Sequence, residues 1–527
     1  MNSHIYIDLV ALRVRSLSGW RRSVLAITLG SGLAAVAMPP AGIWPVLLVT
    51  FSGLVWLLDD AAKSNQHAFV TGWWFGAGFF STSSYWIACA FLVNPESFAW
   101  MIPFALATLT AGLALFTGLA AWLTVTISRP GPQRGIALAG TWTMSEMMRG
   151  ALGFPWNPIA HAWTNVDSML QSAAVFGVYG TSLMTVLMTA VPATLVGSKA
   201  MTGRQRIGVI VAVIGLWTLL FGAGTTRLNI IDRDSQFSKV ENVKLRLVQP
   251  NTNQSLRWVP ELRTKHFLQQ IAMSLGPGFE KITHVIWPET ASAFSLDWHA
   301  EARQLVAKAV PPGGAVLTGV MRTTPPIMTS ARFWNSLMAI NHKGSIVALY
   351  DKAHLVPFGE YIPIIGLLSL PKMTVGSTDF SPGLGIQTMT VPGIPPLSPL
   401  ICYEVIFPGA VVERTGHTRW MLNITNDAWF GMSAGPYQHF ASARWRAVEE
   451  GLPLVRVAVT GISGVIDPYG RIVEVIDLGI MGARDVSLPM ALQKAPLFAQ
   501  WGNTIATALI VICFGTSLML RGHRRRS

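Results

Sequence analysis

The sequence predicts a multi-domain membrane protein: an α-helical transmembrane bundle of about eight spans combined with an α/β domain. Hydrophobic residues make up 51% of the 527 residues and charged residues only 12%, whereas soluble globular proteins carry about 25% charged residues. Apolar runs dominate residues 1–227, where about seven spans are expected, and recur in residues 496–527, which hold a last span and a basic tail. Residues 228–495 between them contain most of the acidic residues and form the expected α/β domain.

Each expected span is an apolar run of about 20 residues, the length that a helix needs to cross a hydrocarbon core of about 30 Å. The fifth run is the weakest because Glu146 and Arg149 interrupt it, so a buried or interfacial helix is the alternative there. The eight runs lie at residues 22–40, 42–58, 68–92, 98–127, 133–150, 172–197, 206–224 and 500–520.

Lys and Arg residues set the expected orientation, because cytoplasmic connections carry an excess of them. They precede the first run, recur in alternate connections and close the chain after Arg521. This alternation puts both termini in the cytoplasm and residues 228–495 on the opposite side of the membrane. It also accounts for the net charge of +13, so we expect membrane lipid and no nucleic acid as a partner.

The segment 228–495 alternates between runs typical of strands and runs typical of helices. Residues 260–275 and 438–451 have the apolar spacing of helices. Branched residues dominate eight short runs that predict strands: 243–249, 283–289, 315–321, 334–340, 345–351, 397–404, 420–426 and 454–461.

Three motifs in this segment carry reactive side chains where a predicted strand ends. Glu289 lies in WPET, Lys352 in YDKAHLVPFGEYIP and Cys402 in LICYEVIFPG. A cysteine must lose its proton to become a nucleophile, and a neighbouring carboxylate can accept it. An ammonium group can stabilise the thiolate and later the oxyanion of a tetrahedral intermediate. Together, the three residues therefore make a complete set for acyl transfer.

Taken singly, each of these residues is weak support for an enzyme, since a lone Glu or Lys is usually a solvated surface group. Cys89 and Cys513 lie in apolar runs and are expected to be inert packing residues. The histidines lack the spacing of metal ligands and no phosphate-binding loop is present, so we expect no metal and no cofactor.

The three motifs resemble those of the nitrilase (carbon–nitrogen hydrolase) superfamily. The placement of such a domain between seven spans and a final span resembles the apolipoprotein N-acyltransferase family over essentially the whole chain. The resemblance implies an α-β-β-α sandwich in which Glu289 is the general base, Lys352 stabilises the oxyanion and Cys402 carries the acyl group as a thioester.

The resemblance also implies supporting residues around this triad. Glu360 corresponds to an additional glutamate, with pairing to Lys352 as the plainer alternative. Trp258 corresponds to a tryptophan on a loop involved in substrate handling, with anchoring of that loop as the alternative. Asn335, Tyr403 and Glu404 correspond to positions that shape the site. The chain departs from the family pattern at residues 249–254 and at Val459, which affects only the expected rim of the pocket.

The implied reaction moves an acyl chain from a phospholipid, expected to be phosphatidylethanolamine, through a Cys402 thioester. The acceptor is the α-amine of a diacylglyceryl-cysteine at the N-terminus of an apolipoprotein, and the product is a triacylated lipoprotein. One alternative is a membrane-anchored nitrilase-type amidase that acts on small amides, since the same triad begins both reactions. A second is a transporter or lipid-binding scaffold, which would not need Glu289, Lys352 and Cys402 together.

Overall fold

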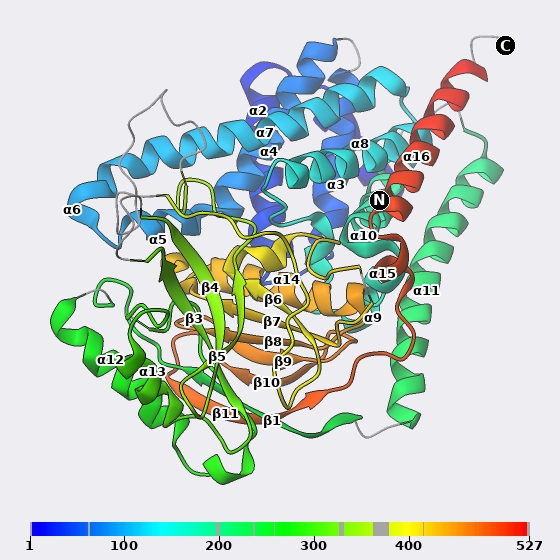
Figure 1. Ribbon diagram of the computed structural model, residues 1–527. Coiled ribbons are helices and arrows are strands. Elements are labelled where there is room, and N and C mark those ends of the chain that lie inside the picture. Colours follow the sequence, from blue (N-terminus) through cyan, green and yellow to red (C-terminus); the bar gives the residue numbers. More distant parts are fainter. Residues whose placement is uncertain are drawn as a thin grey trace. The chain divides into compact units, whose positions relative to one another are not determined.

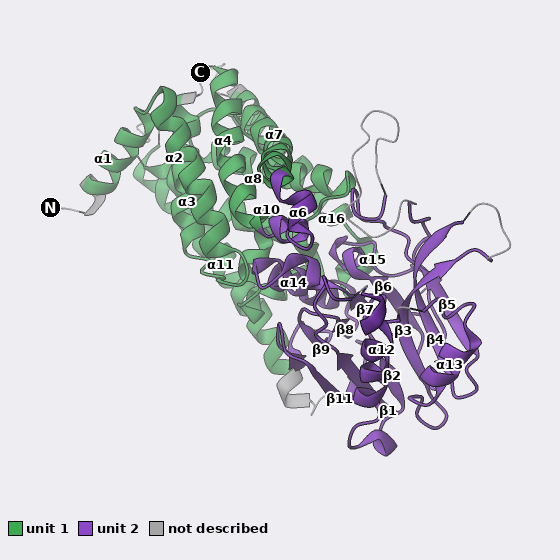
Figure 2. Cartoon of the chain, turned by 90° about the vertical axis from the view of Figure 1, so that its left-hand side faces the viewer, with its two compact units in different colours: residues 1–85, 101–233, 496–527 green, residues 86–100, 234–495 purple. Residues whose placement is uncertain are grey.

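The chain divides into two compact units, coloured separately in Figure 2. Unit 1 comprises residues 1–85, 101–233 and 496–527, and unit 2 comprises residues 86–100 and 234–495. The computed structural model describes residues 3–61, 64–196, 201–234, 238–257, 259–292, 294–325, 331–361, 379–414 and 416–523.

Unit 1 is helical (Figure 1). Small residues allow its helices to approach closely: a Cβ at Gly76 of α4 would lie 1.8 Å from Thr117 Oγ1 of α7, and one at Gly72 would lie 2.4 Å from Ala121 Cβ. Such small residues four apart are typical of packed membrane helices. The longer helices of this unit are α1 (Ser3–Arg15), α2 (Gly19–Gly32), α3 (Val46–Ala61), α4 (Asn65–Ser83), α7 (Ile102–Ile127), α8 (Pro132–Ala151), α10 (Ala173–Ala190), α11 (Gly203–Asp234) and α16 (Thr504–His523).

Short helical turns connect these helices. They are η1 (Leu33–Ala37), η4 (Ile159–Trp163), α9 (Asp167–Leu170), η5 (Pro192–Leu195) and α15 (Leu497–Trp501).

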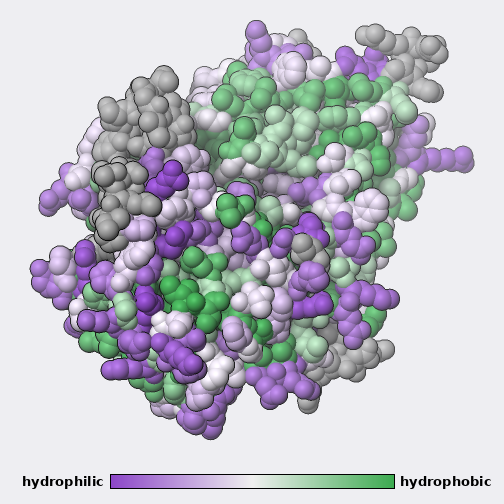
Figure 3. All heavy atoms as spheres, in the orientation of Figure 1, coloured by the Kyte–Doolittle hydropathy of each residue, from purple (hydrophilic) through white to green (hydrophobic). Residues whose placement is uncertain are grey.

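Four helical stretches among the described residues are long and apolar enough to cross a membrane: Pro95–Ile127, Ala173–Leu195, Gly203–Ile230 and Thr504–Arg521. They coincide with the expected fourth, sixth, seventh and eighth spans. The other four expected spans coincide with α2 and η1, α3, α4 and α8, which are shorter or more polar. Apolar atoms are prominent on the surface over the helices of unit 1 in Figure 3, as expected for a membrane protein.

The third expected span, residues 68–92, extends too far. Helix α4 ends at Ser83, and the segment Trp86–Trp100 packs in unit 2 as the short turns η2 (Tyr85–Ile87), α5 (Ala88–Phe91), α6 (Pro95–Phe98) and η3 (Ala99–Met101). The reason is that the Trp86 indole donates a hydrogen bond to Gln438 Oε1 at 3.1 Å, whereas a lipid-facing indole would find no such partner.

The polar residues that weaken the fifth expected span are buried inside unit 1. Glu146 Oε1 accepts hydrogen bonds from Trp142 Nε1 at 3.0 Å and from Ile159 N at 2.8 Å. Arg149 donates to the carbonyl of Phe154 at 2.9 Å. Helix α8 is therefore surrounded by protein, which is the setting in which ionisable groups are tolerated at membrane depth.

Unit 2 contains two sheets. The six-stranded sheet has the order β11-β1-β2-β3-β4-β5, and the five-stranded sheet has the order β10-β9-β8-β7-β6. Strands β1 (Lys239–Gln249), β2 (His284–Ile286) and β3 (Ala315–Thr323) are parallel, as are β6 (Leu397–Ile401), β7 (Trp420–Thr425) and β8 (Leu454–Ala458). The antiparallel strands are β4 (Phe333–Asn341), β5 (Ile346–Asp351), β9 (Ser463–Ile466), β10 (Ile472–Ile476) and β11 (Gly482–Pro489).

The two sheets pack face to face with helices outside them, which is the expected α-β-β-α order. Strand residues alternate between the two faces of a sheet, so Leu317 of β3 lies in a core shared with Leu422 of β7. Its neighbour Val316 faces the opposite core, which contains Phe267 of α12 and Val306 of α13. The longer helices among the described residues of this unit are α12 (Pro260–Ser274), α13 (Ala300–Ala307) and α14 (Ala434–Glu450), and further turns are η6 (Phe279–Lys281), η7 (Cys402–Ile406) and η8 (Asp427–Phe430).

The eight predicted strands are confirmed as β1 to β8, and the two predicted helices as α12 and α14. The sequence reasoning missed β9, β10, β11 and α13. Strands β9 and β10 span four and five residues, β11 mixes charged, polar and small residues, and α13 spans only eight residues. None of them therefore gives a long periodic signal.

Candidate active site

Cys402 lies at the point where strand β6 ends and turn η7 begins. The strand is buried along its whole length, and Cys402 itself has a φ of +52°. A side chain larger than glycine rarely adopts this left-handed conformation, which costs about 1–2 kcal/mol. The turn therefore presents the Cys402 side chain away from the strand direction at a fixed position of a rigid sheet.

Glu289 lies shortly after the end of strand β2 in the six-stranded sheet, as Cys402 lies after the end of β6 in the five-stranded sheet. The next residue, Thr290, also has a positive φ of +47°. The turn packs so closely on Gly319 of β3 that a Cβ there would lie 2.5 Å from Thr290 N. Glycine at position 319 is thus required for the turn that carries Glu289.

Lys352 directly follows β5, and its ammonium nitrogen lies 2.8 Å from Glu360 Oε2. Asn335 of β4 joins this pair to Glu289. Its amide nitrogen donates to Glu289 Oε1 at 2.7 Å and to Glu360 Oε1 at 2.9 Å. All four side chains are buried, so strands β2, β4 and β5 bring them together in one hydrogen-bonded cluster.

The Cys402 sulfur interacts electrostatically with this cluster. Burial raises the pKa of the Cys402 thiol to about 12; the Glu289 carboxylate adds to this and Lys352 opposes it. Burial also raises the pKa of Glu289. The Lys352 ammonium lowers this pKa, and the charge of Glu360 raises it further. Burial would lower the pKa of Lys352, but Glu360, Cys402 and Glu289 outweigh it and raise that pKa. The structure thus brings a thiol, a carboxylate of raised pKa and a permanent ammonium together.

Glu404 holds the backbone around the site. Its Oε1 accepts hydrogen bonds from Tyr350 Oη and Ala353 N, each at 2.8 Å, and from His354 N at 3.1 Å. Its Oε2 accepts from Ile401 N at 2.7 Å. One buried carboxylate therefore ties the end of β6 to the segment that carries Lys352.

Tyr403 packs edge-on against Phe407, with ring centroids 5.2 Å apart. Phe407 in turn stacks on His354 at 4.8 Å. These aromatic contacts link the turn after Cys402 to the segment after Lys352.

Two family models match the chain. Residues 30–191 match the family model described as apolipoprotein N-acyltransferase N-terminal domain, and residues 244–491 match carbon-nitrogen hydrolase. The chain is similar to an apolipoprotein N-acyltransferase of Rhodopseudomonas palustris, with 41% identity over 94% of each chain. It is also similar to that of Bradyrhizobium diazoefficiens, with 38% identity over 98% of each. The chain belongs to the apolipoprotein N-acyltransferase family. A Brucella suis member, 34% identical, is covered over 99% of its length, so the similarity includes both units and does not favour a nitrilase-type amidase.

Residues 249–254, where we expect a departure from the family pattern, are held by hydrogen bonds to the five-stranded half of the unit. Asn251 N donates to the carbonyl of Val459 at 2.8 Å, and Gln254 Oε1 accepts from Asn426 Nδ2 at 2.8 Å. Both partners follow strands of the five-stranded sheet. The segment 249–254 is thus in direct contact with Val459, the other position at which we expect a departure.

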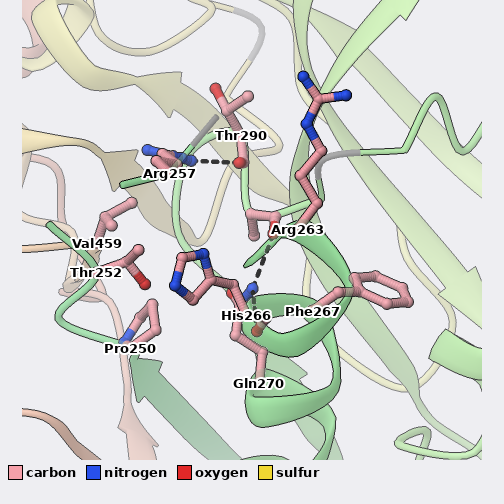
Figure 4. A pocket seen from close by; sticks show the side chains of 10 residues that line it. Pro250, Thr252, Arg257, Arg263, His266, Phe267, Gln270, Thr290 and Val459 are labelled. Atoms are coloured by element: carbon pink, nitrogen blue, oxygen red, sulfur yellow. Dashed lines mark hydrogen bonds between the residues drawn. The ribbon is translucent and has the colours of Figure 1, made fainter. Parts of the chain in front are cut away.

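Arg257 connects the same segment to the turn after Glu289. It donates to the carbonyl of Glu289 at 2.6 Å and to that of Thr290. Arg257 and Thr290 line a small pocket with His266 and Val459 (Figure 4). The expected loop residue Trp258 lies outside the described residues. Arg257 was missed by sequence reasoning, because its neighbours in the sequence give no sign of contact with Glu289.

His439, which the chemistry of Glu289, Lys352 and Cys402 does not require, also lies within the site. Its Nε2 is 3.1 Å from the carbonyl oxygen of Cys402. Asp427 and Arg456, both fully buried, surround it. A signal was present in the sequence: Arg456 interrupts the apolar run LVRVAV, and a charge inside a buried strand requires a partner.

Proposed function

We propose that the protein transfers an acyl chain from a phospholipid to the α-amine of a diacylglyceryl-cysteine at the N-terminus of an apolipoprotein, through a thioester on Cys402. The observation that carries this proposal is the buried cluster of Glu289, Asn335, Lys352 and Glu360, which Glu404 ties to the turn of Cys402. It is present in a chain whose full-length relatives are named for this activity. In the proposed ping-pong scheme the donor, expected to be phosphatidylethanolamine, reacts first.

In the first step Cys402 Sγ attacks the carbonyl carbon of the sn-1 ester while Glu289 takes the thiol proton. A thiol with a pKa of about 12 is protonated at neutral pH, so proton removal must accompany the attack. Lys352 stabilises the oxyanion of the tetrahedral intermediate. The ester C–O bond then breaks, Glu289 returns the proton to the leaving oxygen, and a lysophospholipid departs.

In the second step the acceptor amine attacks the thioester carbonyl. Glu289 accepts a proton from the amine nitrogen, the C–S bond breaks, and the proton restores the Cys402 thiol. The product is an amide-linked third acyl chain. Because water competes with the amine at a thioester, the burial of Glu289, Lys352 and Glu360 supports transfer over hydrolysis.

The supporting residues have proposed roles that follow from their contacts. Asn335 and Glu360 orient Glu289 and Lys352 through the hydrogen bonds that join them. Glu404 and Tyr403 fix the turn that carries Cys402. Trp258 acts in substrate handling on the loop that Arg257 anchors.

The proposed setting is the cell inner membrane, with about eight spans, both termini in the cytoplasm and the catalytic domain in the periplasm. The domains are residues 1–227, 228–495 and 496–527. The alternation of basic connections supports this orientation. Substrates with acyl chains explain why a carbon–nitrogen hydrolase domain is joined to apolar helices, since a soluble amide would not require them.

Two measurements on the purified full-length protein test the reaction class. Protein incubated with phospholipid labelled in its sn-1 chain should gain a label that hydroxylamine removes, and lysophospholipid should be released in equal amount. The Cys402→Ser variant should gain no such label. Full labelling of that variant would overturn the assignment of the nucleophile. Release of ammonia from soluble amides, without lysophospholipid, would favour an amidase.

A further inference from the structure

Two side chains hold the backbone carbonyl of Cys402 through hydrogen bonds. His439 Nε2 lies 3.1 Å from this oxygen, and Asn423 Nδ2 donates to it at 3.3 Å. Asn423 also donates to the carbonyl of Leu400 at 3.2 Å. Since Cys402 is in a left-handed conformation, these bonds fix the orientation of a peptide group that would otherwise relax.

Behind these two donors lies a fully buried ionic network. Arg456 Nη2 lies 2.7 Å from Asp427 Oδ2, and Arg456 Nη1 donates to Asn423 Oδ1. Asp427 Oδ1 lies 2.9 Å from His439 Nδ1. All four side chains are buried, with at most 1% of the His439 side chain exposed, so each hydrogen bond is made in a medium of low dielectric constant, where it has most effect.

The hydrogen positions on His439 follow from its partners. The Cys402 carbonyl can only accept, so Nε2 must carry a hydrogen. On the other side, Nδ1 is 2.9 Å from Asp427 Oδ1 and 3.0 Å from Arg456 Nη2. Both ring nitrogens of His439 therefore have partners. The Nε2–H group donates to the Cys402 carbonyl oxygen whether the imidazole is neutral or protonated.

A contact chain extends this network to the segment Trp86–Trp100. Trp86 packs edge-on against Phe430, with ring centroids 4.4 Å apart, and Phe430 packs edge-on against His439 at 5.9 Å. The Trp86 indole also donates to Gln438, the residue before His439 on α14. Helix α14 is therefore held next to Cys402 by a residue that follows helix α4 in the chain.

We propose that His439 is a positioning residue for the nucleophile and that Trp86 braces it. By holding the Cys402 carbonyl, His439 keeps the peptide in the conformation that presents the sulfur to Glu289 and Lys352. Trp86 keeps α14, and with it the imidazole, at the required distance. This inference rests on the proposed function, because its measured quantity is the rate at which the Cys402 thioester forms.

The first test compares two substitutions of His439 in single-turnover labelling with phospholipid. His439→Leu removes the N–H group and should slow thioester formation about 100-fold, the effect of misplacing a reacting group by about 1 Å. His439→Gln retains an N–H donor at a similar place and should recover most of that loss. His417→Leu, which changes an exposed histidine of the same unit, is the matched control and should label at the wild-type rate.

A thioester rate for His439→Leu within twofold of wild type would overturn the proposal. So would equal rates for the Gln and Leu variants when thermal unfolding shows both to be folded. If His439→Leu fails to fold, the rates of thioester formation of His439→Gln and of the Trp86 variants are compared instead. Slower labelling by the Trp86 variants than by His439→Gln supports the proposal, and wild-type rates in all of them contradict it. The wild-type protein forms the labelled thioester in all these outcomes; its absence there would instead contradict the proposed function.

The second test concerns Trp86. Trp86→Phe retains a ring against Phe430 but loses the hydrogen bond to Gln438, whereas Trp86→Ala loses both. We expect thioester formation to slow modestly in the Phe variant and about tenfold more in the Ala variant, with the donor KM unchanged, because Trp86 acts through His439. A rise in KM at an unchanged maximal rate would instead make Trp86 a substrate-binding residue and refute the bracing role.

Discussion

Lys352 Nζ lies 2.8 Å from Glu360 Oε2, and the same Glu360 shares the amide group of Asn335 with Glu289. Two carboxylates and one ammonium therefore occupy a buried cluster beside a neutral thiol. Burial is the main reason why the pKa of Glu289 is raised, and the charge of Glu360 adds to it, while Lys352, Asn335 and Arg257 offset this rise only in part. A raised pKa suits a residue that must accept and return a proton near neutral pH.

The pH dependence of thioester formation should reflect the raised pKa of Glu289. The carboxylate must be ionised to act as a base, so the rate should fall as the pH drops through this pKa, at a value above the ordinary 4.3 or so of a glutamate. The pKa of Lys352 is also raised, so its ammonium stays charged and gives no loss of rate up to about pH 10. A profile of kcat/KM against pH checks both limbs.

Glu360→Gln should move the acid limb of that profile to lower pH. The charge of Glu360 raises the pKa of Glu289, so its removal favours the ionised base. The maximal rate should fall at the same time, because Lys352 loses the partner that orients it. An acid limb that stays in place would show that Glu289 is not the group titrating.

Lys352→Met should lower kcat/KM by about 10²- to 10³-fold, the usual effect of losing one oxyanion donor. It should also lower the free energy of unfolding by about 3 kcal/mol, because the buried Glu360 carboxylate loses its partner. The double variant Lys352→Met with Glu360→Gln should recover most of the stability and none of the activity. Thermal unfolding and single-turnover labelling of the same samples separate the two effects. Recovery of activity in the double variant would contradict a catalytic role for Lys352.

Cys402→Gly should be more stable than Cys402→Ala by about 1 kcal/mol. Position 402 has a φ of +52°, where a Cβ costs about 1–2 kcal/mol and glycine costs nothing sterically. Both variants lack the thiol, so the comparison isolates the backbone. Thermal unfolding of the two inactive proteins measures the difference; a more stable Ala variant would mean that the left-handed turn is absent.

Glu404→Gln should lower the free energy of unfolding by about 2 kcal/mol. The carboxylate accepts four hydrogen bonds from donors at both oxygens, and an amide nitrogen in either place would face an N–H group. Activity should fall with stability, since the turn at Cys402 loosens. The control is Glu413→Gln, which changes a glutamate of the same unit that accepts a hydrogen bond from Thr388 N. It should leave the free energy of unfolding by denaturant nearly unchanged.

The strand positions and the reactive residues were accessible to sequence reasoning because each has a local signal. Runs of branched residues mark β1 to β8, and Glu289, Lys352 and Cys402 each follow such a run. The family resemblance then supplied the order of the layers and the supporting residues Asn335 and Glu404, whose partners lie far away in the sequence.

The parts that could not be predicted depend on contacts between distant segments. Nothing in the sequence around Trp86 indicates that it leaves the apolar bundle to bond Gln438. The left-handed turn at Cys402 could not be predicted either, because a cysteine does not indicate a positive φ in the way that a glycine does. The role of His439 was hidden as well, because the chemistry expected of Glu289, Lys352 and Cys402 requires no histidine, although the fold places His439 against the carbonyl of Cys402.

Mass spectrometry of the protein purified from membranes tests the central claim most directly. We expect a population heavier by one acyl chain, with the adduct mapped to the peptide that contains Cys402, removed by hydroxylamine and absent from Cys402→Ala. Its mass would also give the length of the donor chain. An acyl chain found on another residue, or retained in the Cys402→Ala variant, would contradict the thioester mechanism.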